Sequence, residues 1–184
     1  GLSDPTNEAS SLQQRVRDIE AVVTANSLDK FYLMGISEGG PMSVQYACEN
    51  PERIKGLILL GTTAKFLRDE SYPVGLSENT LNKLIENWGN GQTRDIFFPS
   101  ISREIMSDEV YQGAEKLLAD KRSMAQIVNY MKVLDVREFL PRLTCPTLVI
   151  HFSGDLAVSV RMGRAMSNLI PNAQFLEVEG VDHC

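Results

Sequence analysis

One serine lies in a sequence that is typical of a catalytic nucleophile. Ser37 is the centre of the segment GISEG (residues 35–39), which has the pattern G-x-S-x-G and directly follows the apolar run FYLM. A strand that turns sharply into a helix forces one residue into a strained conformation, and glycines on both sides remove the side chains that would clash there. We therefore expect Ser37 to stand at the carboxyl edge of a sheet, with its hydroxyl exposed as a nucleophile.

A serine is a poor nucleophile at neutral pH unless a base takes its proton during the attack. The chain contains two histidines, His151 and His183. His151 lies within an apolar run that we interpret as a strand, and a histidine there is expected to be buried and hydrogen-bonded. His183 follows a strand and lies in a loop. We therefore prefer His183 as the base.

Two aspartates compete for the role of the acid that orients this base. Asp155 lies just beyond the apolar run that contains His151, and Asp182 is the neighbour of His183 in the chain. Asp182 would have difficulty reaching the far nitrogen of the adjacent ring, so we prefer Asp155, which would fix the imidazole tautomer and stabilise the imidazolium. We expect the His183 ring to approach both Ser37 Oγ and Asp155 within about 2.6–3.2 Å.

An alternation of strands and helices would bring these side chains together. The apolar pattern predicts buried strands at residues 31–36, 56–60, 146–151 and 174–178, and helices at residues 39–49 and 159–169. Asp4 can cap a first helix that runs to about Ala25. Such an alternation predicts a parallel sheet covered on both faces, whose ligands gather at the carboxyl ends of the strands. Ser37, Asp155 and His183 each follow a different strand at that end.

Residues 67–140 contain no convincing strand, and we predict a helical insertion there. Ser77 and Ser107 can cap two of its helices, and residues 124–131 carry the apolar spacing of a third. We therefore divide one domain into a nucleophile half (1–66), a helical cap insertion (67–140) and a part that carries the acid and the histidine (141–184). Trp88, Met124 and Met131 pack the insertion as core in one interpretation and line an acyl pocket in the other.

The composition limits the class of protein. The chain has 184 residues, of which 43% are apolar and 23% are charged, and a net charge of −6, which is typical of one globular domain. Scattered acidic residues and the lack of a basic groove argue against nucleic acid as a partner. No apolar stretch is long enough to span a membrane, and no signal peptide is visible. Three widely spaced cysteines form neither a disulfide framework nor a zinc spacing, so we expect a reducing compartment, the cytoplasm.

The order Ser37, Asp155, His183 resembles that of the α/β-hydrolase fold family, where nucleophile, acid and base follow one another in this way. The segment FSGDLAVS (152–159) is similar to the family's G-x-x-D-x-x-V-P, with a phenylalanine and a serine in place of its glycine and proline. GVDH (180–183) resembles the family's G-x-x-H, and NPERI (50–54) resembles the segment after its nucleophile helix. Residues 35–43, 88–91 and 135–141 together resemble, more closely, hydrolase domains fused to nucleotide-cyclase domains in bacteria.

This resemblance implies which parts of the family's architecture the chain carries. The strands would be the fifth to eighth of the family's sheet, with a helical cap insertion, and the chain would be a fragment that lacks the first four strands and the last helix. The backbone N–H of Glu38 would be one donor to the oxyanion, while the loop that gives the second donor would lie outside the chain, so we expect weak catalysis. Two roles stay open for the Glu38 side chain, which would repel anionic substrates or point into solvent.

The leading hypothesis is a serine hydrolase that cleaves a carboxylic ester, thioester or lactone of a small apolar substrate, without a metal or cofactor. A non-enzymatic sensor of small molecules is the alternative suggested by the resemblance to cyclase-fused domains. A further alternative is a fragment that folds only as an oligomer. Because the family's neighbour of the strand Phe31–Ile36 would be missing, we expect a homo-oligomer or a complementing chain to pair with that edge.

Overall fold

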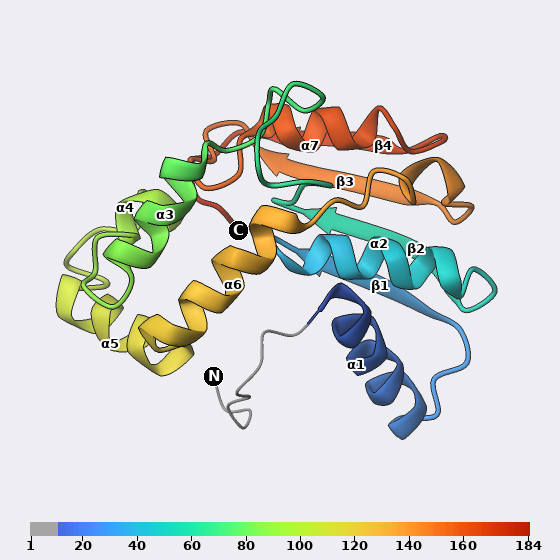
Figure 1. Cartoon of the computed structure of the whole chain (residues 1–184), viewed down its shortest axis with the longest axis horizontal. Coiled ribbons are helices and arrows are strands. Elements are labelled where there is room, and N and C mark those ends of the chain that lie inside the picture. The colour runs from blue at the N-terminus through green and yellow to red at the C-terminus, as the bar shows by residue number, and fades with distance from the viewer. Residues whose placement is uncertain (1–10) are drawn as a thin grey trace.

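The sheet is parallel throughout, as the sequence predicts. The structure, a computed structural model, describes residues 11–184, and within them the sheet has the order β1-β2-β3-β4. The strands are β1 (Phe31–Ile36), β2 (Ile54–Leu60), β3 (Thr147–Phe152) and β4 (Gln174–Val178). Because all strands run the same way, their carboxyl ends share one edge, which Figure 1 shows facing the helices of residues 78–133.

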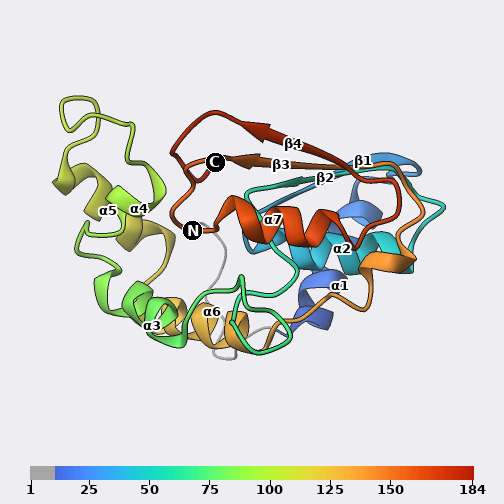
Figure 2. The same ribbon diagram turned by 90° about the horizontal axis from the view of Figure 1, so that it is seen from above.

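Three helices cover one face of this sheet. They are α1 (Leu12–Ala25), α2 (Gly39–Glu49) and α7 (Val160–Ser167), and Figure 2 shows all three below the strands. The first helix begins with Ser11, whose hydroxyl accepts the N–H of Gln14 at 3.2 Å. The predicted end at Ala25 is confirmed, whereas the predicted cap at Asp4 lies outside the described residues.

The prediction that the strands are buried on both faces is wrong for the described part of the chain. Tyr32, Met34 and Ile36 of β1 are 70%, 47% and 42% exposed. They alternate with Phe31 and Leu33, which pack partly against the core. Successive side chains of a strand point to opposite faces, and no described helix packs on the face to which these three belong (Figure 2). A continuous apolar run therefore does not reveal which face is covered.

Four helices form the cap segment (residues 77–133) beyond the carboxyl ends of the strands (Figure 1). They are α3 (Glu78–Asn87), α4 (Arg94–Phe97), α5 (Asp108–Leu118) and α6 (Lys121–Val133). Ser77 and Ser107 cap α3 and α5 as predicted, through bonds from the backbone N–H groups of Thr80 and Val110. The short helix α4 has no signal in the apolar pattern and was not predicted.

A buried carboxylate organises the turn that follows α3. Glu115 of α5 accepts the N–H groups of Gly89 and Gly91 at 3.1 and 2.8 Å, and Thr93 donates its hydroxyl to the same side chain. Val110 of the same helix, by contrast, is exposed. A buried carboxylate is stable only when its oxygens are hydrogen-bonded, so these three donors allow Glu115 of α5 to stay buried.

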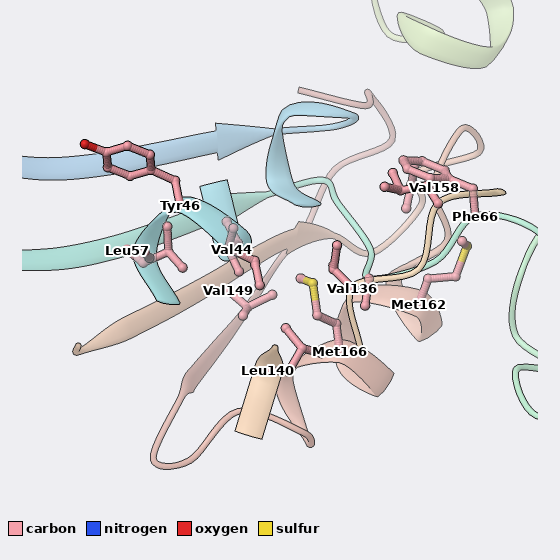
Figure 3. Close-up of a cluster of buried hydrophobic side chains, with 14 of the residues drawn as sticks. Val44, Tyr46, Leu57, Phe66, Val136, Leu140, Val149, Val158, Met162 and Met166 are labelled. Carbon is pink, nitrogen blue, oxygen red and sulfur yellow. The ribbon is translucent and has the colours of Figure 1, made fainter. Parts of the chain in front are cut away.

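The core lies between the sheet and the helix layer, and the ends of the cap segment are anchored in it. Figure 3 shows side chains of α2, β2, β3 and α7 packed with Leu140 of the short 3-10 helix η1 (Leu140–Arg142) and with three side chains from connecting segments, Phe66, Val136 and Val158. The segments before and after the cap segment also bind each other, since the N–H of Val136 donates to the carbonyl of Ala64 at 2.9 Å. The cap segment is therefore held over the sheet edge by buried apolar contacts at its base.

Packing between α7 and β3 gives a testable expectation. A Cβ on Gly163 would lie 2.2 Å from Nδ1 of His151, whereas a Cβ on Gly113 of α5 meets nothing within 4 Å. We expect Gly163→Ala to lower the free energy of unfolding by about 1–3 kcal/mol through overpacking. Gly113→Ala should raise it by about 1 kcal/mol through helix propensity. Urea denaturation of both variants measures the difference, and equal stabilities would contradict the packing described.

Candidate active site

Ser37 occupies a strained turn between β1 and α2. Its φ is 50°, a left-handed conformation that is costly for a residue with a side chain. The neighbouring backbone leaves no room for larger residues: a Cβ on Gly40 would lie 2.1 Å from Thr62 Oγ1, and one on Gly35 would lie 2.8 Å from the Cα of Gly40. The hydroxyl of Thr62 also donates to the carbonyl of Ser37 at 2.5 Å. The segment just beyond β2 thus holds the turn that presents Ser37.

Asp155 and His183 come together although 28 residues separate them. Asp155 Oδ1 accepts the N–H groups of Ala157 and Val158 at 2.8 and 2.9 Å, which fixes the loop after β3. Asp155 Oδ2 lies 2.8 Å from His183 Nδ1. The backbone N–H of His183 in turn donates to the carbonyl of Phe97 at 2.8 Å, so α4 of the cap segment helps to place the histidine.

One expected contact is not formed. Ser37 and His183 line the same cavity, yet His183 Nε2 has no hydrogen-bond partner within the described residues, so the expected bond to Ser37 Oγ is absent. Because a carboxylate only accepts, Nδ1 carries a proton, and in the neutral ring Nε2 keeps its lone pair. His183 therefore has a free acceptor nitrogen, and hydrogen bonds of this kind often tighten only when a ligand binds.

His151 is a second histidine beside the same carboxylate. It is fully buried, as predicted for a strand position, and its Nε2 donates to the carbonyl of Val158 at 2.6 Å. The same nitrogen lies 3.4 Å from Asp155 Oδ2. Asp155 is therefore flanked by both histidines, an arrangement that the linear sequence does not show because His151 comes from inside β3.

These contacts determine the charge of Asp155. Burial by itself raises the pKa of a carboxyl group, but the hydrogen bonds from His151 and His183 outweigh it and hold the pKa of Asp155 below its ordinary value. The carboxylate form is therefore favoured. Asp155 can serve as the fixed negative charge next to His183.

Two acidic residues near the site have partners that the sequence did not suggest. The carboxylate of Glu38 forms an ion pair with Arg15 of α1 at 3.1 Å, so it does not simply point into solvent. Asp182, which the sequence analysis rejected as the acid, accepts the N–H of Ser100 at 2.9 Å and thereby ties the loop before His183 to the cap segment. Neither partner could be inferred from the sequence, because both lie far away in the chain.

A cavity of about 330 Å³ opens at the carboxyl ends of the strands. Most of its lining is apolar, and α6 contributes Met124 and Met131, which lie on one face of that helix. Trp88 lines it too, and its indole N–H donates to the carbonyl of Ala119 at 2.8 Å. The two open interpretations of these residues are therefore compatible, because they pack the cap segment and also line the cavity that contains Ser37 and His183.

The described residues contain no group of three or more His, Cys, Asp or Glu side chains that could hold a metal ion. The polar groups that line the cavity are instead the serine, the histidine, Glu38, and three residues of α3, Thr80, Lys83 and Asn87. This arrangement could activate a hydroxyl group beside an apolar binding space.

The comparisons with known proteins establish the family. A family model described as alpha/beta hydrolase fold matches residues 1–184, and the chain belongs to that family. A pimeloyl-[acyl-carrier protein] methyl ester esterase from Nitrosomonas europaea is 24% identical over 155 residues, covering 80% of this chain and 62% of the esterase. A cis-3-alkyl-4-alkyloxetan-2-one decarboxylase from Shewanella oneidensis is 27% identical over 205 residues, covering 100% of this chain and 64% of the decarboxylase.

The solved structures agree with the fold. An esterase from Exiguobacterium antarcticum has a TM-score of 0.85 and 23% identity, over 100% of this chain and 70% of that structure. The predicted fold class, an α/β-hydrolase-like parallel sheet, is therefore confirmed. The chain spans only about 62% of the length of the esterase from Nitrosomonas europaea. Similar chains carry names of different reactions, so the fold by itself does not define the chemistry.

The pKa of Asp155 gives a testable dependence of stability on pH. Its pKa is lower in the folded state than the ordinary value of about 3.9. The ionised carboxylate therefore adds stability above that value, and the contribution is lost as the pH falls through the lower pKa of the folded state. We expect Asp155→Asn to destabilise the protein at pH 7, and we expect the difference from the wild type to shrink as the pH falls below about 4.

Urea denaturation of both proteins between pH 7 and pH 3 measures this difference. Asp29→Asn is a matched control, because Asp29 is exposed and makes no hydrogen bond or ion pair within the described residues. For the control, we expect the difference in unfolding free energy from the wild type to stay constant with pH. A constant difference for Asp155→Asn as well would contradict the lowered pKa of Asp155.

Proposed function

We propose that the protein is a serine hydrolase that cleaves a carboxylic ester, thioester or lactone of a small apolar molecule. The observation that supports this most directly is the bond between Asp155 and His183, because it leaves His183 Nε2 as an acceptor in the cavity that Ser37 also lines. The strained turn at Ser37 and the family of the chain support the same conclusion.

In this proposal each residue has one task. Ser37 Oγ attacks the carbonyl carbon while His183 Nε2 takes the hydroxyl proton, and Asp155 stabilises the imidazolium that forms. The backbone N–H of Glu38 donates to the oxyanion of the tetrahedral intermediate. His183 then gives its proton to the leaving oxygen or sulfur. Water, activated by the same histidine, releases the acyl group from Ser37.

The cavity supports the substrate class. Its volume of about 330 Å³ suits a small molecule, and its apolar lining, including Trp88, Met124 and Met131, suits an acyl chain. The relative from Nitrosomonas europaea carries the name of a methyl ester esterase, which agrees with an ester as the substrate. No metal or organic cofactor takes part in this reaction scheme.

The second candidate is a domain that binds a small molecule without turnover. The observation that favours it is the missing hydrogen bond between Ser37 and His183, because a cavity can bind an ester without an activated nucleophile. The resemblance to hydrolase domains fused to nucleotide cyclases suggests a signalling role for such a domain. Turnover of an ester separates the two candidates.

We also propose that another polypeptide covers β1. Tyr32, Met34 and Ile36 expose an apolar surface, and β1 pairs only with β2 within the described residues. A free strand edge next to exposed apolar side chains favours pairing with a further chain. The partner would be a second copy or a complementing chain.

No helix within residues 11–184 is both long and apolar enough to cross a membrane. Cys48, Cys145 and Cys184 are free thiols. Free thiols suit a reducing compartment, so we propose the cytoplasm as the location.

The proposed function predicts the effect of removing the nucleophile or the base. Ser37→Ala and His183→Ala should each lower the hydrolysis of a neutral nitrophenyl ester by at least about 10³-fold, because the two residues act as a unit. Ser71→Ala is the control, since this exposed serine contacts Asp69 and Arg137 outside the cavity. Saturable ester binding without turnover by the wild type would favour the sensor. Equal turnover by wild type and Ser37→Ala would refute the proposed nucleophile.

The proposal for β1 predicts an assembly that depends on its exposed face. We expect light scattering of the purified chain to give at least the mass of a dimer. Replacing both Tyr32 and Met34 with lysine should shift the chain toward monomer, because a charge opposes burial of that face. A double variant that exchanges the charges of two other exposed residues, Lys55→Glu with Glu52→Lys, is the control. A monomeric wild type that remains folded would contradict this proposal.

A further inference from the structure

Glu38 creates an electrostatic problem for the proposed reaction. Its backbone N–H is the proposed donor to the oxyanion, yet its own side chain carries a carboxylate that lines the cavity. The transition state of ester cleavage develops negative charge on the carbonyl oxygen, and a nearby negative charge opposes that development in a partly dehydrated site. A reaction that depends on this N–H therefore requires the Glu38 charge to be compensated.

Arg15 of α1 supplies the compensating charge. Its Nη1 lies 3.1 Å from Glu38 Oε1, and the side chains of Arg15 and Glu38 are only 17% and 32% exposed. At such burial, salt screens the pair less than it screens charges on the open surface. The contact joins α1 to the start of α2 across 23 residues of sequence, so it is not a local pair of one helix.

The position of Arg15 is set from its other side by the cap segment. The guanidinium lies over the ring of Tyr130 in α6, 4.5 Å from the ring centre, which is a cation–π contact. Burial raises the pKa of Tyr130 to about 12, so this ring stays uncharged at neutral pH. Arg15 is thus held between the nucleophile turn and the cap helix.

No other described cation is paired with Glu38. Among the residues that line the cavity, Lys83 makes no ion pair within the described part of the chain, and Glu38 Oε2 has no hydrogen-bond partner there. The single bond between Arg15 Nη1 and Glu38 Oε1 is therefore what neutralises the carboxylate. Loss of Arg15 would leave an uncompensated charge on the residue next to Ser37.

We propose that Arg15 is a positioning residue of the hydrolase, which neutralises and orients Glu38 so that negative charge can form on the substrate's carbonyl oxygen. This inference rests on the proposed function of Ser37 and Glu38. Arg15 acts through Glu38 and touches no reacting atom. Arg15 would stabilise the charged transition state and would not change the binding of a neutral ester.

The test removes the positive charge of Arg15 but keeps a long, unbranched side chain. Arg15→Met should lower kcat for a neutral nitrophenyl ester by about 10–100-fold. KM should stay within about 2-fold, because Arg15 does not contribute to the binding of the uncharged substrate. Arg17→Met is the matched control on the same helix, since Arg17 is exposed and contacts Gln14. The control should keep the wild-type kcat.

A double-mutant cycle separates charge compensation from a merely structural role. In the E38Q background no carboxylate needs compensation, so Arg15→Met should cost less than about 3-fold in kcat. A phenylboronic acid provides a second readout. Ser37 Oγ adds to boron, its proton passes to His183, and the adduct carries a negative charge on boron. Its affinity should fall with Arg15→Met by about the same factor as kcat, and only when Glu38 is present.

Equal losses of kcat from Arg15→Met in both backgrounds would overturn the proposal, as would an increase of KM alone. These outcomes differ from failure of the proposed function. If wild type and Ser37→Ala hydrolyse the ester equally, the function itself is wrong, and the role of Arg15 falls with it. If Ser37 is required but Arg15→Met is silent, only the inference about Arg15 fails.

Discussion

The steric constraint at the end of β1 is the feature on which the rest of the site depends. Ser37 has a φ of 50°, and Thr62, just beyond β2, holds it there by donating to its carbonyl and packing against Gly40. The parallel register of β1 and β2 brings these groups together. The turn thus stores local strain that the surrounding tertiary packing compensates.

The carboxylates of the site are stabilised by partners from distant parts of the chain. Asp155 is stabilised by His151 from within β3 and by His183 from beyond β4. Glu38 is paired with Arg15 of α1. A buried or half-buried carboxylate is costly unless it is paired. The cavity therefore has an apolar lining, and the carboxylates in or behind it are held by hydrogen bonds at Asp155 and by an ion pair at Glu38.

Local chemistry explains why much of the fold could be predicted. Serine hydroxyls cap α3 and α5 at the predicted positions, and strand β1 has its predicted bounds, because capping and apolar runs are encoded within a few residues. The predictions failed where burial depends on distant neighbours. Met34 is exposed because no described helix packs on its side of the sheet, and a local pattern cannot reveal which face is covered.

The sequence by itself determined the parallel α/β class, the G-x-S-x-G turn and the candidates Ser37, Asp155 and His183, because spacing and strand order suffice to place residues at one sheet edge. Only the tertiary structure decided which groups meet there. It set His151 beside Asp155 and Arg15 against Glu38, and it left His183 Nε2 without a bond to Ser37. Hydrogen bonds and ion pairs depend on distances of a few ångströms between remote residues, and no local pattern specifies such distances.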